Sequence, residues 1–224
     1  MYILSFDTTG SFCSVALYKN KTVLASEYNI VSGSQSESLI PMIQRILSKV
    51  GLSIKDLHYV AVTNGPGSFT GIRVGLSAAQ AFCVSYNVIP CVINTFELYN
   101  YRIASQVGDG VHCGIVVLLA YSKRFYVQVF DYLKCTKSSY MLLDIDEVQT
   151  LLLKQRGITA VSGTGLSYFQ QLFLLEKYVF LPRYIHSRLL AELAFEKISK
   201  GGFEKNLSPL YIQEPSINNK KGLV

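Results

Sequence analysis

The first half of the chain alternates between apolar runs typical of strands and apolar residues at helical spacing. The runs 1–6, 11–18 and 22–28 predict three strands, with Lys19–Asn20–Lys21 as the turn between the last two. From residue 39 the apolar residues recur every three or four positions, which predicts a helix that ends at Gly51, with Pro41 in its first turn. The run 59–63 predicts a further strand.

A glycine-rich stretch, TNGPGSFTGIRVG at 63–75, follows that strand and predicts a tight turn leading into a helix. Gly65 and Gly67 can adopt backbone angles closed to other residues, and Ser68 or Thr70 is placed to cap the helix. Such a turn presents N–H groups that suit an anion, yet it lacks the Gly-Lys-Ser/Thr ending of a nucleotide P-loop. Phosphate binding and tight packing of strand against helix are both compatible with it.

The helix after the turn is apolar on two sides. One face carries Ile72, Leu76, Ala79, Phe82 and Cys83, and a second, nearly smooth face carries Val74, Ala78 and Ala81 together with Gly71 and Gly75. A helix that is apolar on two sides is either fully buried or covered by another chain. The pattern leaves both readings open.

The second half repeats the strand, turn and helix pattern, which predicts an α/β protein with two lobes. Strands are expected at 89–94, 112–119, 125–131 and 158–161, and helices at 95–105, 144–156, 166–176 and 187–200. Thr95 is expected to cap the first of these helices, Asp144 with Glu147 to form a capping box, and Ser187 to cap the last helix. The polar break at 106–110 is the predicted boundary, which gives an N-terminal lobe at 1–106 and a smaller C-terminal lobe at 107–224. The polar tail from Pro209 is expected to be loose past Pro215.

Composition narrows the function classes. Only 16% of the 224 residues are charged and the mean hydropathy is +0.28, which indicates either a large core or apolar surface kept for a partner. The net charge of +6 is scattered, which is weak evidence for a nucleic-acid groove. Five cysteines without a C-x-x-C pair and three isolated histidines argue against a metal cluster or a disulfide framework. No run is long enough to span a bilayer and no basic leader is present, so we expect a cytosolic protein.

Several separated motifs coincide in one order along the chain. They are Asp7–Thr8–Thr9 with Ser14–Val15–Ala16–Leu17, the helix start Leu39–Ile40–Pro41, the G-P-G-S-F-T-G-x-R-x-G run at 65–75, Gly163–Thr164–Gly165, and Pro209–Leu210–Tyr211. With these motifs the chain resembles the bacterial TsaB (YeaZ) family of Gcp-like proteins, which have the actin/Hsp70/sugar-kinase (ASKHA) fold with a mixed sheet and flanking helices in each lobe. The resemblance covers nearly the whole chain and is strongest over 1–95.

The resemblance implies a non-catalytic subunit of the machinery that makes N6-threonylcarbamoyladenosine (t6A) at position 37 of tRNA. Such a subunit forms a heterodimer with a TsaD-type transferase, helps to recruit a TsaE-type ATPase, forms a homodimer when isolated, and reaches tRNA through the complex. The metal and the transfer step belong to the transferase. The expected interface lies on the first two helices, at Leu39, Met42, Ile43, Ile46, Gly71, Val74, Gly75, Ala78 and Ala81.

The residues also argue against catalysis. The turn Asp7–Thr8–Thr9 could hold a phosphate and a metal-bound water, but residues 117–122, where the second phosphate turn of the fold would lie, contain no carboxylate. Asp7, Thr8, Thr9, Gly163 and Gly165 are therefore candidates for a vestigial nucleotide site, and we expect no catalytic residue, metal or cofactor.

The sequence departs from the family at two places. Gln35 stands where many relatives have His, and residues 119–121 stand where many have Asp-Ala-Arg.

The alternative function is a small-molecule kinase or ATPase of the same fold that uses Asp7, Thr8 and Thr9. A metallopeptidase is a remote third, because the sequence has no ligand cluster.

Overall fold

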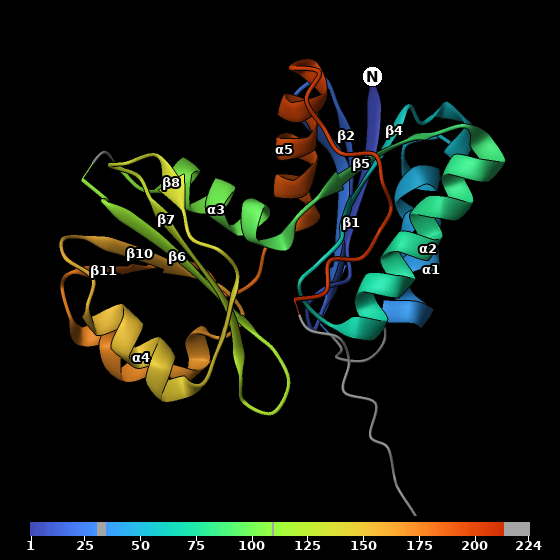
Figure 1. The fold of residues 1–224 in the computed structure, drawn as a ribbon. Helices are drawn as coiled ribbons and strands as arrows, with labels where there is room; N and C mark the ends of the chain where they lie inside the picture. Colours follow the sequence, from blue (N-terminus) through green and yellow to red (C-terminus); the bar gives the residue numbers. More distant parts are fainter. Residues whose placement is uncertain (31–34, 109, 213–224) are drawn as a thin grey trace, which may run out of the picture.

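The computed structural model describes residues 1–30, 35–108 and 110–212, which form two mixed sheets with helices around them (Figure 1). The tail expected to be loose past Pro215 lies outside these residues. The first sheet has the order β3-β2-β1-β4-β5, in which β1, β2 and β3 pair antiparallel and β1, β4 and β5 pair parallel. Its strands are β1 (Tyr2–Asp7), β2 (Cys13–Lys19), β3 (Thr22–Asn29), β4 (Tyr59–Thr63) and β5 (Ile89–Ile93). The strands predicted here are confirmed.

Two helices cover one face of this sheet (Figure 1). Helix α1 (Gln35–Lys49) packs on β2, and helix α2 (Phe69–Tyr86) packs on β4, with a short 3₁₀ turn η1 (Ile54–Asp56) between them. Helix α1 begins at Gln35, so Pro41 lies in the second turn and not in the first as predicted. Pro41 is exposed there, where its missing N–H removes one hydrogen bond without crowding the core.

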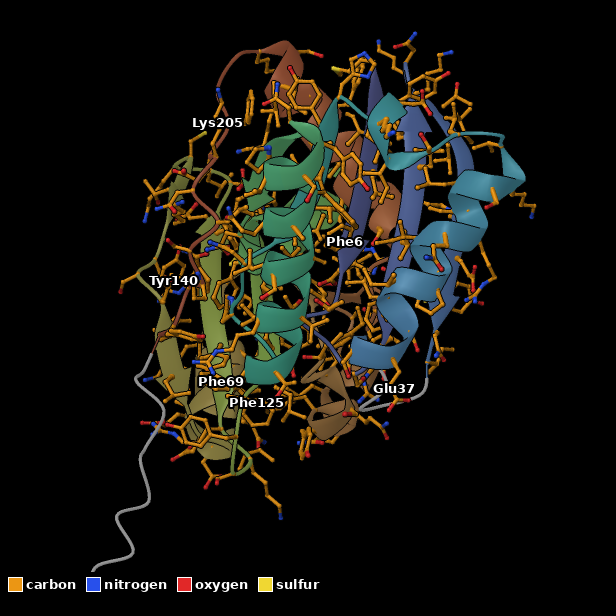
Figure 2. The ribbon with its side chains drawn as sticks, turned by 90° about the vertical axis from the view of Figure 1, so that its right-hand side faces the viewer. Phe6, Glu37, Phe69, Phe125, Tyr140 and Lys205 are labelled. Atoms are coloured by element: carbon orange, nitrogen blue, oxygen red, sulfur yellow. The ribbon has the colours of Figure 1, made fainter. Side chains whose placement is uncertain are left out.

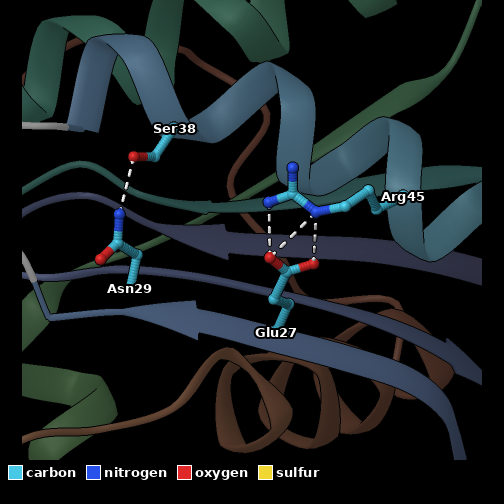
Figure 3. A network of polar contacts seen from close by, with 4 residues as sticks. All are labelled: Glu27, Asn29, Ser38 and Arg45. Carbon is cyan, nitrogen blue, oxygen red and sulfur yellow. Dashed lines mark hydrogen bonds and ion pairs between the residues drawn. The ribbon is translucent and has the colours of Figure 1, made fainter.

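Polar contacts tie the edge strand β3 to helix α1 (Figure 3). The guanidinium of Arg45 donates to both carboxylate oxygens of Glu27, with Nε 3.1 Å from each, and the Asn29 amide donates to Ser38 Oγ at 2.9 Å. The Glu27–Arg45 pair is half exposed, so its contribution to stability is small. The pair joins the edge strand β3 to helix α1 and so holds the strand in place beneath the helix.

The second sheet has the order β11-β10-β6-β7-β8, with β9 pairing to β7. Its strands are β6 (Cys113–Leu119), β7 (Phe125–Asp131), β8 (Thr136–Lys137), β9 (Met141–Leu143), β10 (Thr159–Ser162) and β11 (Tyr178–Phe180), and helix α4 (Ile145–Leu153) lies against it. The sequence pattern missed β8, β9 and β11, which are two or three residues long. The capping box of Asp144 and Glu147 at the start of α4 is confirmed.

The helix predicted at 166–176 is wrong, because the chain forms two short 3₁₀ turns there. These are η2 (Leu166–Tyr168) and η3 (Gln170–Leu174). The buried side chains Leu166, Phe169 and Leu172 recur every third residue, which is the repeat of a 3₁₀ helix and not of an α-helix. This spacing brings all three side chains into the core of the second sheet.

Helices α3 (Thr95–Gln106) and α5 (Ser187–Ser199) pack against each other between the two sheets, with α3 on β6 and β10 of the second sheet. Helix α5 packs mainly on β1 and β2, so the sequence-based assignment of the terminal helix to the second lobe is wrong in space (Figure 1). Its Leu190, Ala191 and Ala194 lie fully buried in a core that includes residues of both sheets. The boundary at residues 106 and 107 stays a prediction.

Two helix caps differ from those expected. Asn94 caps α3, because its side-chain oxygen accepts from Phe96 N at 2.7 Å. Ser187 does not cap α5, since the preceding residue, His186, holds the cap position. The Ser187 hydroxyl instead donates to the carbonyl of Ser14 on β2 at 2.7 Å. A contact across 173 positions of sequence therefore replaces the predicted local one.

Candidate functional site

The glycine turn packs directly against the turn that follows β1. Ser68 N donates to Thr9 O at 2.7 Å, and Thr8 Oγ1 donates to Gly71 O at 2.6 Å. A Cβ at Gly67 would lie 2.4 Å from Thr9 O, and a Cβ at Gly71 would lie 1.9 Å from Thr8 O. Both distances are far below van der Waals contact. Glycine at these two positions therefore allows the backbone of the turn after β1 to lie close against the start of α2, as the packing interpretation requires.

Gly65 is shaped by the C-terminal segment. It has φ +108°, and a Cβ there would lie 2.9 Å from Leu210 O. Leu210 N donates to Asn64 O at 2.8 Å, and the Asn64 amide donates to Ser208 O at 3.1 Å. Residues 208–211 are thus fastened to the start of the glycine turn.

Asp7 lies where β1 ends and is almost completely buried. Its Oδ1 accepts three hydrogen bonds, from Thr9 N at 2.9 Å, Thr9 Oγ1 at 2.7 Å and Thr63 Oγ1 at 2.6 Å. Short contacts of this kind hold the carboxylate in one orientation. The sequence analysis correctly placed Asp7 and Thr9 in one turn, but it did not identify Thr63 as a hydrogen-bond partner of Asp7.

A cleft of about 940 Å³ lies between the two sheets and is lined by Asp7 and by the glycine turn. Thr9, Ser68 and Thr95 belong to the wall built by the first sheet and its helices. The opposite wall, from the second sheet and its β6–β7 turn, includes Leu118, Tyr121 and Tyr126. Figure 2 shows Phe69, another lining residue, at the first turn of α2. One wall of the cleft is rich in hydroxyl groups and the other is apolar and aromatic.

Three of the five residues predicted for a nucleotide site do not line this cleft. Thr8 is fully buried under Gly71. A Cβ at Gly163 would lie 2.1 Å from Val117 O, and Gly165 is in close contact with Phe125 and Val117. The small size of the two glycines and the hydroxyl of Thr8 therefore serve internal packing, and the vestigial nucleotide site stays a prediction. Asp7 and Thr9 do line the cleft.

The first-helix half of the predicted interface is wrong for this monomer. Leu39, Met42, Ile43 and Ile46 are at most 3% exposed and pack in the core beneath α1. The helical stripe read from the sequence is the face that α1 turns toward β2. A stripe of large apolar residues on a single side of a helix belongs to the core.

The interface residues predicted on the second helix, α2, divide between core and surface. Gly71 and Gly75 are buried against Thr8, so their assignment to the interface is also wrong. Val74 and Ala78 are half-buried and Ala81 is exposed, and these three remain candidates for contact with a partner. They lie on the flank of α2, about a quarter turn or more from its buried face.

The sequence also missed residues at the mouth of the cleft. Tyr211 packs its ring 5.4 Å from Phe69, and its hydroxyl accepts from Arg73 Nε at 3.1 Å. Arg73 in turn lies over the Phe69 ring at 3.7 Å. The motif Pro209–Leu210–Tyr211 had marked this segment only as part of the resemblance. Tertiary contact was needed to show that Tyr211 lines the cleft.

In the part of the chain that the structure describes, no three His, Cys, Asp or Glu side chains gather as a metal site would require. Within the same residues, every helix is too short or too polar to cross a bilayer.

Comparisons with known proteins agree with this geometry. A family model described as TsaD: tRNA N6-adenosine threonylcarbamoyltransferase matches residues 29–171, more than half of the chain. The tRNA threonylcarbamoyladenosine biosynthesis protein TsaB of Buchnera aphidicola subsp. Baizongia pistaciae is 28% identical over 95% of this chain and 98% of that relative. The TsaB of Buchnera aphidicola subsp. Schizaphis graminum is 36% identical, over 43% of this chain and 45% of that protein, so this match spans less than half of the relative.

The solved structure of YeaZ from Pseudomonas aeruginosa shares the fold. It has a TM-score of 0.76 at 20% identity and covers 94% of this chain and 99% of its own. The expected two-lobe α/β fold of the YeaZ type is confirmed.

Proposed function

The chain belongs to the family described as TsaD: tRNA N6-adenosine threonylcarbamoyltransferase, and from this premise we propose that it works in tRNA threonylcarbamoyladenosine biosynthesis as a TsaB-type subunit without transfer chemistry of its own. Its similarity to a TsaB protein over almost the full length of both chains supports the pathway. The residues that line its cleft support the absence of a transfer reaction.

The observation that carries the non-catalytic role is the single carboxylate of the cleft. Among the described lining residues, Asp7 is the only acid, and its Oδ1 is already engaged by Thr9 and Thr63. Phosphoryl transfer depends on metal ions and cationic groups that neutralise the developing charge. The opposite wall supplies Leu118 and tyrosines in place of acids. The kinase alternative therefore finds no support in the residues that face Asp7.

We further propose that the flank of α2 is where the TsaD-type transferase docks. Val74, Ala78 and Ala81 form a strip of small side chains, which lets another helix approach closely, and Val84, 76% exposed, lies about one turn beyond Ala81. A homodimer of isolated chains would use the same strip. The TsaE-type ATPase would join the heterodimer, and tRNA would be reached through the complex.

Co-expression with the TsaD-type transferase of the same organism tests this proposal. The two chains should elute together in gel filtration at micromolar concentration. Ala81→Glu places a charge on the proposed strip, and burying it without a partner should weaken the complex by about 3 kcal/mol, roughly a hundredfold. Gln80→Glu adds the same charge at the neighbouring exposed position, about 100° around the helix, and should leave the complex intact. Separate elution of the unmodified chains would refute the proposal.

A further inference from the structure

One end of the second sheet brings together segments that are far apart in the sequence. Tyr132 N, just after β7, donates to His112 O at 3.0 Å, and His112 N, just before β6, donates to Ile158 O at 3.0 Å. One residue later, Thr159 N donates to Lys177 O at 2.8 Å, at the start of β11. These bonds place the end of β7 and the starts of β6, β10 and β11 side by side.

A side chain adds the end of α4 to the same surface. Lys177 Nζ donates to Leu153 O at 3.1 Å and to Gln155 O at 3.3 Å. Leu153 is the last residue of α4, so the loop that follows this helix lies against the start of β11. The segments 132–137, 153–158 and 175–177 therefore form one surface, which we call the basic end of the second sheet.

The basic end carries an excess of positive charge. Its segments contain one acid, Glu176, and these basic residues: Lys134, Lys137, Lys154, Arg156 and Lys177. Lys134 pairs with Asp131, just outside the segments, at 3.5 Å. Lys137, Lys154 and Arg156 are exposed, and none of the three forms an ion pair within the residues that the structure describes. Three cations are thus available to a partner.

Four large aliphatic side chains are exposed among these cations. Leu133 is 72% exposed, and Leu153, Ile158 and Leu175 are between 40% and 48% exposed. A single exposed apolar residue is ordinary on a protein surface. Four of them within three neighbouring segments form a patch, and an apolar patch with a charged rim is typical of an interaction site.

This combination favours an acidic protein segment as the partner. Single-stranded nucleic acids stack their bases on exposed aromatic rings, whereas Tyr132, the one aromatic residue of the basic end, is half-buried and donates to Asn100 Oδ1 at 2.7 Å. A second copy of this chain, docked face to face, would bring like charges together, which is unfavourable. Carboxylates beside aliphatic side chains would match both the cations and the apolar patch.

The size of the surface suits a short helix. Neighbouring strands lie about 4.8 Å apart, so the four adjacent strands β11, β10, β6 and β7 span about 15 Å at this end. A helix rises about 1.5 Å per residue, so about three turns cover that distance. Such a helix presents two or three apolar and several acidic side chains on one side.

We propose that the basic end docks an acidic amphipathic helix of a partner protein. The carboxylates of this helix meet the three unpaired cations, and its aliphatic stripe covers the exposed leucine and isoleucine side chains. Figure 1 shows β10 and β11 on the side of the molecule away from α2, so this surface does not overlap the flank of α2. The proposal is therefore independent of the proposed role in the tRNA pathway.

Fluorescence anisotropy of a labelled synthetic peptide, measured with the full-length chain, tests this proposal. The probe is a helix-forming peptide of about 18 residues with leucines at i, i+3, i+4 and i+7 and glutamates on both sides of them. The control peptide has the same composition in scrambled order. We expect a dissociation constant below about 100 μM at about 50 mM salt, and an affinity at least about tenfold lower for the scrambled peptide.

Three results of this titration would overturn the proposal. They are equal affinity for the two peptides, no binding of the probe at about 1 mM, and tighter binding of a single-stranded RNA of the same net charge.

Charge reversals locate the binding surface. Lys154→Glu combined with Arg156→Glu should weaken binding of the probe at least about tenfold, because both cations become anions opposite its glutamates. Lys49→Glu combined with Lys55→Glu is the control, since it changes the net charge equally at exposed positions of the first lobe. Equal affinity of the two double variants for the probe would refute the inference.

A further pair of variants tests the apolar part of the surface. Leu133→Ser should weaken binding of the probe about fivefold, because it removes the most exposed aliphatic side chain of the basic end. Ile30→Ser, at a 63% exposed position on the first lobe, should leave the affinity unchanged. If Leu133→Ser binds the probe as tightly as Ile30→Ser does, an amphipathic helix is not what this surface docks.

Discussion

Replacing Gly75 by alanine should destabilise the protein, although alanine is the better helix former. A Cβ at Gly75 would lie 2.6 Å from Thr8 Oγ1, whereas its next neighbour, Val62 Cγ2, lies at an ordinary 3.4 Å. Thr8 has no freedom to give way, because it is fully buried and its Oγ1 donates to Gly71 O at 2.6 Å. The clash is therefore with one hydroxyl held in place by one hydrogen bond.

The opposing contributions can be compared. Alanine in place of glycine within a helix gains up to about 1 kcal/mol. Overpacking a core position costs about 1–3 kcal/mol, and losing the Thr8–Gly71 hydrogen bond costs about 1 kcal/mol more. We expect Gly75→Ala to lower the free energy of unfolding by about 1–3 kcal/mol. For a chain of this size that is a fall in Tm of about 2–12 °C.

A double-mutant cycle with Thr8→Ala isolates the cause. Thr8→Ala removes the clashing atom, so Gly75→Ala introduced into that variant should be neutral or stabilising by up to about 1 kcal/mol. Urea unfolding of the four proteins, followed by circular dichroism, gives the coupling energy. Gly202→Ala is a control, because a Cβ there meets nothing within 4 Å. If Gly75→Ala costs the same with and without the Thr8 hydroxyl, the close approach of Thr8 to α2 is not what requires glycine at this position.

Two further predictions concern titrating groups. Burial raises the pKa of the Cys13 and Cys91 thiols to about 12, so an alkylating reagent at about pH 8 should modify exposed Cys135 quickly and those two only after unfolding; a Cys135→Ser variant that still reacts quickly would contradict this. Burial, reinforced by nearby arginines, lowers the pKa of His186, so the unfolded chain binds its proton more readily and stability should fall as the pH drops below about 6.5. Urea midpoints at about pH 7.5 and 5.5 should differ less in His186→Gln than in the unmodified protein, and equal differences would refute the assignment.

Much of the fold followed from patterns within short stretches of sequence. The strands of the first sheet, the helix start at Ser68 and the capping box at Asp144 depend on residues within a few positions of one another. Local preferences of this kind act before any tertiary contact forms, so the sequence reveals them directly. The longer predicted elements had the right type except at 166–176, where two 3₁₀ turns stand in place of a helix. The three short strands of the second sheet were too short for such a pattern.

The candidate site was predicted only in part. Asp7 and Thr9 were identified because the turn that carries them is local, whereas Thr95 and Tyr211 were read as a cap and as part of a motif. Their place in the cleft depends on segments that meet from distant parts of the chain, such as Tyr211 against Phe69. No spacing rule within one segment reports such a meeting.

The sequence by itself determined that this chain is an α/β protein with a glycine turn between a strand and a helix that is apolar on two sides. Only the tertiary structure decided which apolar faces are core, that α5 belongs on the first sheet through Ser187 and Ser14, and that Gly71 and Gly75 face Thr8. The physical reason is that the hydrophobic effect is non-directional: an apolar face gains about the same free energy whichever surface shields it from water. An apolar pattern therefore predicts that a face will be buried, but not which element buries it. The partner is selected by packing and hydrogen bonding between residues far apart in the chain.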